Sequence, residues 1–295
     1  MSGASDTPNP RAVIVVSSHV ARGSVGNRAA VFALETLGFP VWAVPTVTLP
    51  WHPGHGSATR IVPPPDQFTA LMRDLEGARW LDEVGGVLSG HLGDETQGQA
   101  VASLVRAVKK RNPRALYVCD PVLGDESGLT VPQAVAESIR DRLMPLADLA
   151  TPNRFELEWL SGAALPNMNA VMSAALHAGP SSMLVTSAPV PNPGSTGNFL
   201  LTPSEAMLAE HRVIEQAPKG LGDLTAAVFL ARLMSGHTHA KALQAATAAV
   251  FEILARTAKR GADELTLETD SQSLSHPMAM VQMKRLPHPA EDRRA

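Results

Sequence analysis

The chain lacks several features that would assign it quickly to a class. It has one cysteine in 295 residues, so it can form no internal disulfide, which suits a reducing cytoplasm. No apolar run reaches about 18 residues and the start is polar, so we expect neither a membrane span nor a secretory signal. The net charge is −3 without a basic stripe, which argues against nucleic acid or an anionic membrane as the main partner.

Two common nucleotide-binding motifs are also missing. No G-x-x-x-x-G-K-[ST] occurs, which excludes a P-loop enzyme at the motif level. The segment 17–27 contains glycines but not the three-glycine dinucleotide fingerprint, which disfavours a Rossmann dehydrogenase. No internal repeat or Gly/Ser linker divides the chain. We therefore expect one domain over residues 11–286, a flexible N-terminal segment 1–10 and a flexible tail 287–295.

The chain alternates between short apolar runs and amphipathic stretches. The apolar runs, typical of buried strands, are 12–16, 41–44, 84–88, 116–119, 148–150 and 183–185. The amphipathic stretches predict helices at 27–37, 66–75, 96–110, 132–142, 155–160 and 169–178. A β-pair is expected at 197–201 and 210–214, and an Ala-rich helix at 240–260. This order predicts an α/β fold with a mainly parallel central sheet and helices on both faces.

The most informative segment is Gly220-Leu221-Gly222-Asp223, which runs into an apolar stretch with helical spacing from Leu224 to Met234. Two glycines before a helix let backbone N–H groups point the same way, and the helix start adds partial positive charge. Together these features predict an anion site. A carboxylate beside such a site suits the acceptance of a proton from a hydroxyl that attacks phosphorus. The segment therefore indicates phosphoryl transfer to an alcohol.

Polar residues follow several of the predicted strands. They are Ser18, Ser89, Asp120, Asn153 and Thr186. Ligands of open parallel sheets bind beyond the carboxyl ends of the strands, so we expect these side chains near one site. Gly/Pro-rich segments at 49–65 and 188–197 are predicted to be loops that cover it.

Four motifs in order resemble the pyridoxal kinases of the ribokinase superfamily. They are Ser18-His19-Val20 with Gly26-Asn27-Arg28, then Cys119-Asp120-Pro121-Val122-Leu123-Gly124-Asp125, then Thr151-Pro152-Asn153-Arg154-Phe155-Glu156, and finally Gly220-Leu221-Gly222-Asp223. The resemblance runs from about residue 12 to residue 260 and includes the superfamily's N-x-x-E and G-x-G-D patterns. It implies a three-layer ribokinase-like fold and a cytoplasmic enzyme that uses ATP to phosphorylate the 5′-hydroxymethyl group of pyridoxal.

The resemblance implies that Asp223 is the catalytic base. It also implies that Gly220 and Gly222, with Leu221 between them, hold the transferred phosphoryl group through backbone N–H groups. The simpler alternatives are a helix N-cap for Asp223 and a plain tight turn for the glycines. Because a helix start favours the charged carboxylate, we expect Asp223 to be a weak base.

For the nucleotide, the resemblance implies a network of Asp120, Asp125, Thr151, Asn153 and Glu156 that organises Mg-ATP and a monovalent cation, expected to be K⁺. Asp120, Asp125 and Glu156 would be the metal-binding members, since Mg²⁺ prefers oxygen ligands. Simpler alternatives are a turn-initiating Asp120 and an ordinary first-turn acid at Glu156. Thr186 and Ser187 would contact nucleotide phosphate, or else cap a loop.

For the acceptor, the resemblance implies contacts from Ser18, His19, Thr46 and His52, with a flap over about 46–65. The sequence departs from the family pattern at Pro53-Gly54, at His91 and at Thr130, where a polar pair and two aromatic residues are usual. Trp51 would then stack on the ring or pack the flap. These departures affect the ring contacts and leave the phosphoryl-transfer residues intact.

Two other functions remain compatible with these residues. One is a related kinase for hydroxymethylpyrimidine or a sugar, which would share the fold and Asp223. The other is a non-catalytic vitamin B6-binding protein on the same fold, for which a base beside an anion site has no use. The family commonly forms homodimers, so the resemblance also implies a dimer.

Overall fold

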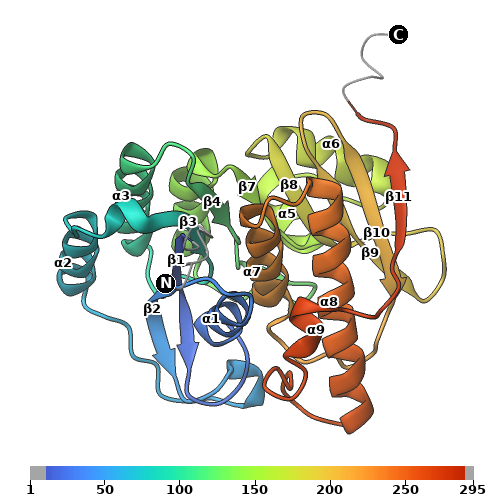
Figure 1. The fold of residues 1–295 in the computed structure, drawn as a ribbon, viewed down its shortest axis with the longest axis horizontal. Coiled ribbons are helices and arrows are strands. Elements are labelled where there is room, and N and C mark those ends of the chain that lie inside the picture. The colour runs from blue at the N-terminus through green and yellow to red at the C-terminus, as the bar shows by residue number, and fades with distance from the viewer. Residues whose placement is uncertain (1–10, 290–295) are drawn as a thin grey trace, which may run out of the picture.

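The computed structural model describes residues 11–289 (Figure 1). The predicted N-terminal segment 1–10 and the tail residues 290–295 lie outside this range. None of the helices within it is long and apolar enough to cross a membrane.

A nine-stranded sheet crosses the molecule in the order β11-β10-β9-β8-β7-β4-β3-β1-β2. Within this sheet, the neighbouring strands β2, β1, β3, β4, β7 and β8 pair in parallel. Strands β9, β10 and β11 then add an antiparallel edge. The strands, including those of a separate hairpin, are β1 (Ala12–Val20), β2 (Val41–Leu49), β3 (Val84–Ser89), β4 (Leu116–Cys119), β5 (Gly124–Asp125), β6 (Gly128–Leu129), β7 (Leu149–Ala150), β8 (Ser182–Ala188), β9 (Ser195–Leu201), β10 (Ala206–Arg212) and β11 (Gln282–Leu286).

Helices cover both faces of the sheet (Figure 1). They are α1 (Asn27–Thr36), α2 (Pro65–Glu76), α3 (Gln97–Arg111), α4 (Gln133–Ser138), α5 (Arg154–Ser161), α6 (Met168–His177), α7 (Leu221–Met234), α8 (His239–Arg260) and α9 (Gln272–Ser275). Short 3₁₀ turns lie at Pro53–His55, Leu81–Glu83 and Met144–Leu146, and a π-helical turn at Ile139–Leu143 continues α4.

The hydrophobic core is divided by the sheet into two parts. One contains residues of α2 to α6, such as Phe68 and Leu104, and the other contains residues of α1, α7 and α8, such as Phe229 and Ile253. Helix α7 is buried from Leu224 to Ala231 because α1 and α8 flank it over the sheet. An apolar helix start at this position is therefore held firmly against the strand ends.

The fold class predicted from the sequence is confirmed: a mainly parallel sheet lies between two helical layers. Two boundaries differ in ways that matter. Helix α7 begins at Leu221, so Asp223 is the third residue of its first turn, and Gly220 is the N-cap. Strand β10 begins at Ala206, four residues before the predicted start at 210. The hairpin β5–β6 and the edge strand β11 were not predicted.

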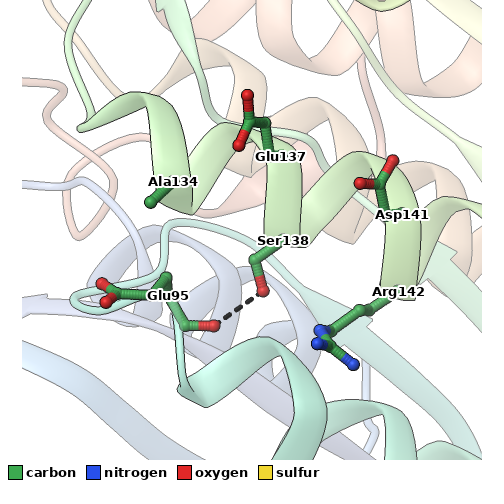
Figure 2. Close-up of a pocket in the computed structure, with 6 residues that line it drawn as sticks. All are labelled: Glu95, Ala134, Glu137, Ser138, Asp141 and Arg142. Carbon is green, nitrogen blue, oxygen red and sulfur yellow. Dashed lines mark hydrogen bonds between the residues drawn. The ribbon is translucent and has the colours of Figure 1, made fainter.

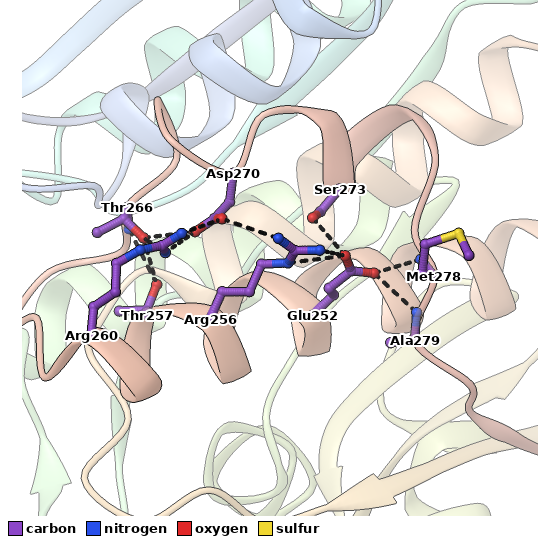
Figure 3. A network of polar contacts seen from close by, with 9 residues as sticks. All are labelled: Glu252, Arg256, Thr257, Arg260, Thr266, Asp270, Ser273, Met278 and Ala279. Carbon is purple, nitrogen blue, oxygen red and sulfur yellow. Dashed lines mark hydrogen bonds and ion pairs between the residues drawn. The ribbon is translucent and has the colours of Figure 1, made fainter.

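A polar network holds the C-terminal segment against α8 (Figure 3). Glu252 accepts hydrogen bonds from the backbone N–H groups of Met278 and Ala279, at 2.5 and 3.0 Å, and pairs with Arg256 at 2.8 Å. Next to it, Asp270 pairs with Arg260 at 2.5 Å. Within the predicted tail, His288 is buried and its Nε2 bonds the carbonyl of Thr202 at 2.8 Å.

Candidate active site

Backbone hydrogen bonds place the ends of the parallel strands side by side. At this edge, four residues donate their N–H groups to carbonyls in the neighbouring strand or in the segment that directly follows it. The bonds are Gly90 to Val16 at 2.9 Å, Asp120 to Ser89 at 2.8 Å, Thr151 to Cys119 at 3.0 Å and Thr186 to Pro152 at 2.9 Å. The predicted polar residues therefore lie along one edge of the sheet, although Ser18, Ser89 and Thr186 lie within β1, β3 and β8 and do not follow these strands as predicted.

The glycine segment forms the start of α7 over this edge. Gly220 has φ 99°, and a Cβ on it would lie 2.0 Å from the carbonyl oxygen of Ser24, so only glycine fits. Gly222 is different: a Cβ there would meet nothing within 4 Å. No side chain caps α7, so the first-turn N–H groups of Leu221 and Gly222 remain available to an anion.

Asp223 is half-buried in the first turn of α7, beside the end of β3. A Cβ on Gly90 would lie 3.8 Å from its Oδ1. Burial raises the pKa of Asp223 to about 6, although the backbone N–H groups of Gly26 and of Asp223 itself lower it. The prediction that the helix start makes Asp223 a weak base was wrong, because desolvation outweighs the helix dipole.

Asp120 lies at the end of β4 and is 5% exposed. Its Oδ1 accepts a hydrogen bond from Thr151 Oγ1 at 2.8 Å. Burial and the nearby carboxyls of Asp223 and Glu156 raise the pKa of Asp120 well above its ordinary value. Within residues 11–289, none of these three carboxyls forms an ion pair with a basic side chain. A group of buried acids without a basic partner suits a bound cation.

Glu156 is held by main-chain donors on both carboxylate oxygens. Oε1 accepts from Leu123 N at 2.9 Å and from Gly124 N at 3.4 Å, and Oε2 accepts from Asn153 N at 2.8 Å. Asn153 Oδ1 in turn accepts from Glu156 N at 2.8 Å, which completes a capping box at the start of α5. Burial raises the pKa of Glu156 to about 7 against these hydrogen bonds.

Asp125 does not join Asp120 and Glu156 in a common metal cluster. Its Oδ2 pairs with Lys219 Nζ at 2.8 Å, and Oδ1 accepts from the N–H and the hydroxyl of Ser127 at 3.0 and 2.5 Å. Lys219 and Ser127 hold the pKa of Asp125 below its ordinary value. In the part of the chain that the structure describes, no three His, Cys, Asp or Glu side chains are grouped to hold a metal ion. The metal-binding role predicted for Asp120, Asp125 and Glu156 therefore stays a prediction, with Asp125 held apart from the other two by Lys219.

A cavity of about 410 Å³ opens beside this group, lined by Asp125, Glu126, Asn153, Arg154, Phe155 and Ser187. Asn153 spans its floor, since Nδ2 donates to the Gly124 carbonyl at 2.8 Å. Thr186 bridges Asn153 in the sheet, and Ser187 has φ 54°, a left-handed conformation that is uncommon for serine. Predicted nucleotide residues from β8, α5 and the β5–β6 hairpin thus border one cavity.

The predicted acceptor residues lie at the ends of β1 and β2. Ser18 is 8% exposed and adjoins Gly26, on which a Cβ would lie 2.4 Å from Ser18 Oγ. Thr46 Oγ1 donates to the His91 carbonyl at 2.7 Å. His91, which replaces an expected aromatic residue, donates its N–H to Ser17 Oγ at 3.2 Å. Burial and the charge of Arg60 lower the pKa of His91 to about 4, so its ring is neutral at neutral pH.

The predicted flap leaves β2 at Leu49 and returns at Ile61, which bridges Thr48. Trp51 Nε1 donates to the Gly56 carbonyl at 3.1 Å, a contact that favours packing within the flap. His52 Nδ1 accepts from Gly54 N at 3.0 Å, which caps the 3₁₀ turn. Burial and the charge of Lys219 lower the pKa of His52. Burial also lowers the pKa of His19, at the end of β1.

Sequence reasoning missed several residues that shape the site. Gln97 Nε2 donates to the Thr46 carbonyl at 2.8 Å, and its Oε1 accepts from Gly93 N at 2.8 Å. Glu264 pairs with His55 of the flap at 2.8 Å and accepts from Ser24 N at 3.3 Å. Gln97 stands among other polar residues at the start of α3, so nothing local distinguishes it, and no local pattern indicates that Glu264 meets residues 209 and 240 positions away.

A second hollow, of about 400 Å³, lies away from the strand ends (Figure 2). It is lined by Glu95, Ala134, Glu137, Ser138, Asp141 and Arg142, and Ser138 Oγ bonds the Glu95 carbonyl at 2.7 Å. The lining carries three acidic side chains and one arginine. This charge does not suit a nucleotide.

A mainly parallel sheet between helical layers, with a helix-start cradle at the ends of its strands, defines a kinase of the ribokinase-like fold. The family model for phosphomethylpyrimidine kinase matches residues 82–268. The chain is 36% identical over 281 residues to the pyridoxal kinase PdxY of Rubrobacter xylanophilus. The aligned region covers 93% of this chain and 97% of that one. The chain belongs to the pyridoxal kinase family.

Solved structures agree with this placement. The pyridoxal kinase of Leishmania donovani in complex with ADP and pyridoxamine superimposes with a TM-score of 0.87 at 26% identity, over 94% of this chain and 100% of that one. The same enzyme in complex with ADP and pyridoxine gives 0.86 at 27% identity, over 93% and 99%.

Proposed function

We propose that this protein transfers the terminal phosphoryl group of ATP to the 5′-hydroxymethyl group of pyridoxal, giving pyridoxal 5′-phosphate for vitamin B6 salvage. The observation that carries the proposal is the position of Asp223. It is a partly desolvated carboxylate in the first turn of a helix whose leading N–H groups have no side-chain cap. The similarity to pyridoxal kinases, one of them bound to ADP and pyridoxamine, supports the choice of donor and acceptor.

Asp223 accepts the proton of the attacking hydroxyl. With a pKa of about 6 it is mostly ionised at pH 7.5 and more basic than an ordinary carboxylate. The transition state of phosphoryl transfer is loose, so positioning and charge stabilisation matter more than the strength of the base. The N–H groups of Leu221 and Gly222 stabilise the charge on the transferred group, and the open space around Gly222 allows its close approach.

The nucleotide occupies the cavity bordered by Asn153 and Ser187, with Thr186 beside it. Mg²⁺ would be held by Asp120 and Glu156 together with the phosphates, and would neutralise charge on the phosphate oxygens. The buried acids fit a cation because no basic side chain of residues 11–289 pairs with them. The proposal also includes a monovalent cation, K⁺. Its oxygen ligands would come from Asp120, Thr151 and Asn153.

The pyridine ring lies near Ser18, Thr46 and His91, under the flap that carries His52. Closure of the flap excludes water, which would otherwise hydrolyse ATP. His19 stands at the end of β1 and is proposed as a further ring neighbour. The proposal also includes a homodimer, which the family membership supports. A cytoplasmic location is supported by the single, buried cysteine, Cys119.

A substrate panel tests the proposal. Wild-type protein with Mg-ATP should release ADP in the presence of pyridoxal, pyridoxine or pyridoxamine, and mass spectrometry should detect the phosphorylated vitamer. Chelation of Mg²⁺ should abolish turnover. Hydroxymethylpyrimidine belongs in the same panel because the matching family model is that of phosphomethylpyrimidine kinase.

Faster phosphorylation of hydroxymethylpyrimidine than of pyridoxal would move the assignment to the related kinase. Tight binding of pyridoxal without ADP release would instead identify a vitamin-binding protein. In that case D223N would leave ligand binding unchanged and would have no turnover to remove.

A further inference from the structure

Lys219 directly precedes the glycine segment, and the four family motifs assign it no role. It directly precedes Gly220, the N-cap of α7, and so stands at the rim of the cradle. Its side chain is 57% exposed, and its ammonium reaches Asp125 Oδ2 at 2.8 Å, across 94 residues of sequence. The side chain therefore extends from the glycine segment to the β5–β6 hairpin.

The place that the ammonium reaches is the mouth of the nucleotide cavity. Asp125 lines this cavity together with Asn153, Arg154 and Ser187. Lys219 thus links the residue next to the N-cap of α7 with a residue that lines the cavity. The terminal phosphates of a nucleotide that fills the cavity and reaches the cradle would pass through this region.

The pairing with Asp125 is easily exchanged. Both side chains are largely exposed, at 57% and 41%, and exposed ion pairs contribute little to stability. A polyphosphate carries more negative charge than one carboxylate and offers several acceptor oxygens, so it would compete well for the ammonium. A phosphate near Asp125 would also be repelled unless a cation intervened.

The flap lies close to the same charge. Lys219 contributes to the lowered pKa of His52, second only to burial. The ammonium thus contacts the carboxylate of Asp125 and acts electrostatically on His52 of the flap, and Arg154 is a second basic side chain of the same cavity. A cation at this junction can contact a ligand from the glycine side while the flap closes over it.

We propose that Lys219 binds the terminal phosphates of the nucleotide, and that Asp125 holds its ammonium in place until the nucleotide arrives. This inference rests on the proposed use of ATP and adds a positioning residue outside the four motifs. Lys219 contributes a mobile charge, whereas the amides of α7 contribute a fixed cradle. Its contribution is therefore confined to ligands that carry β- and γ-phosphates.

Binding measurements with the β,γ-imido analogue of ATP and with AMP test this. In K219M, the Kd of the analogue should rise about 10- to 100-fold, since a charge-assisted hydrogen bond is lost. The Kd of AMP should change less than twofold. K219R should restore part of the affinity, and K241M, which alters an exposed lysine of α8, is the matched control. With pyridoxal as acceptor, kcat/KM for ATP should fall by a similar factor while KM for pyridoxal stays unchanged.

Equal analogue affinity in K219M and K241M would overturn the proposal, as would an equal loss of AMP and analogue binding. A second test concerns Asp125. In metal-free buffer, D125N should tighten analogue binding severalfold, and by less when K219M is also present. Equal effects with and without K219M would show that Asp125 does not hold Lys219.

The binding experiments separate this proposal from the proposed function. If wild-type protein binds the analogue but does not phosphorylate pyridoxal, the acceptor assignment fails, and the comparison of K219M with K241M still decides the role of Lys219. If wild-type protein binds no analogue, both fail.

Discussion

Replacement of Asp223 by asparagine should sharply reduce activity and at the same time stabilise the fold. The physical reason is the raised pKa of this carboxyl. A rise from 3.8 to about 6 means that the site disfavours the charged form by up to about 3 kcal/mol. Asparagine keeps an oxygen that can accept the hydrogen bond from Gly26 but carries no charge. At pH 8 the free energy of unfolding of D223N should therefore exceed that of the wild type by about 1–3 kcal/mol.

The sign of the effect depends on pH in a defined way. Because the native pKa lies above the ordinary value, the ionised carboxylate lowers native-state stability above about pH 6. The gain from D223N should shrink as the pH falls from about 6 towards 3.8, and it should vanish only about one pH unit below 3.8, where Asp223 is protonated in both the folded and the unfolded chain. Urea unfolding at pH 8, 6 and 4.5 measures this trend, with D74N on the exposed face of α2 as the matched control.

The substitution that stabilises the fold should lower the catalytic rate. Loss of a general base removes about 10²- to 10⁴-fold in kcat, and KM for ATP should change little. Wild-type kcat/KM for pyridoxal should fall as pH drops through about 6, because a protonated Asp223 cannot accept the proton. The residual activity of D223N should lack this limb. Retained activity, or a D223N protein no more stable than D74N, would refute the reasoning.

Further variants test the cradle, the loop clamp and the flap. G220A should fold poorly or lose activity, since φ 99° and a Cβ at 2.0 Å from a carbonyl oxygen leave no room for a side chain. G222A should fold normally by circular dichroism and lose activity only because its methyl group disturbs the contact with the phosphoryl group. E156A should lower the free energy of unfolding by about 2–4 kcal/mol, because three backbone N–H groups lose their acceptor, and E156Q, which keeps one oxygen acceptor, should lose less. H55A should release the flap from Glu264 and raise KM for pyridoxal with little change in Tm; unchanged KM would show that this pair does not hold the flap.

Much of the fold could be predicted from the sequence because its elements are strongly periodic. Strand β4 was placed at its observed bounds, and α1 and α3 within one residue at each end. Strand β10 was placed too late because its buried residues do not alternate: Leu208, Ala209 and Glu210 are buried in succession between two neighbouring strands. Strand β11, with Lys284 and Arg285 at its centre, carries no apolar run that would indicate a strand.

The grouping of several predicted residues at one edge of the sheet could be foreseen, and their electrostatics less so. Asp120, Asn153 and Glu156 lie together because parallel strand ends share one edge, which the order of the motifs already implies. The basicity of Asp223 was misjudged, since the helix start is visible in the sequence and the burial around it is not. The sequence suggested Asp125 as a metal ligand. Its pairing with Lys219 joins residues 94 positions apart, and no local pattern indicates such a contact.

The carboxylate of Glu156 joins segments that have separate places in the sequence. It ties residues 123 and 124 of the hairpin to the first turn of α5, and it does so through main-chain donors alone. Opening of α5 takes away the acceptor of the N–H groups of residues 123 and 124, and opening of those residues leaves Glu156 Oε1 without its donors. In hydrogen exchange, these amides should therefore open as a single cooperative unit, and a nucleotide that rests against one segment should slow exchange in both.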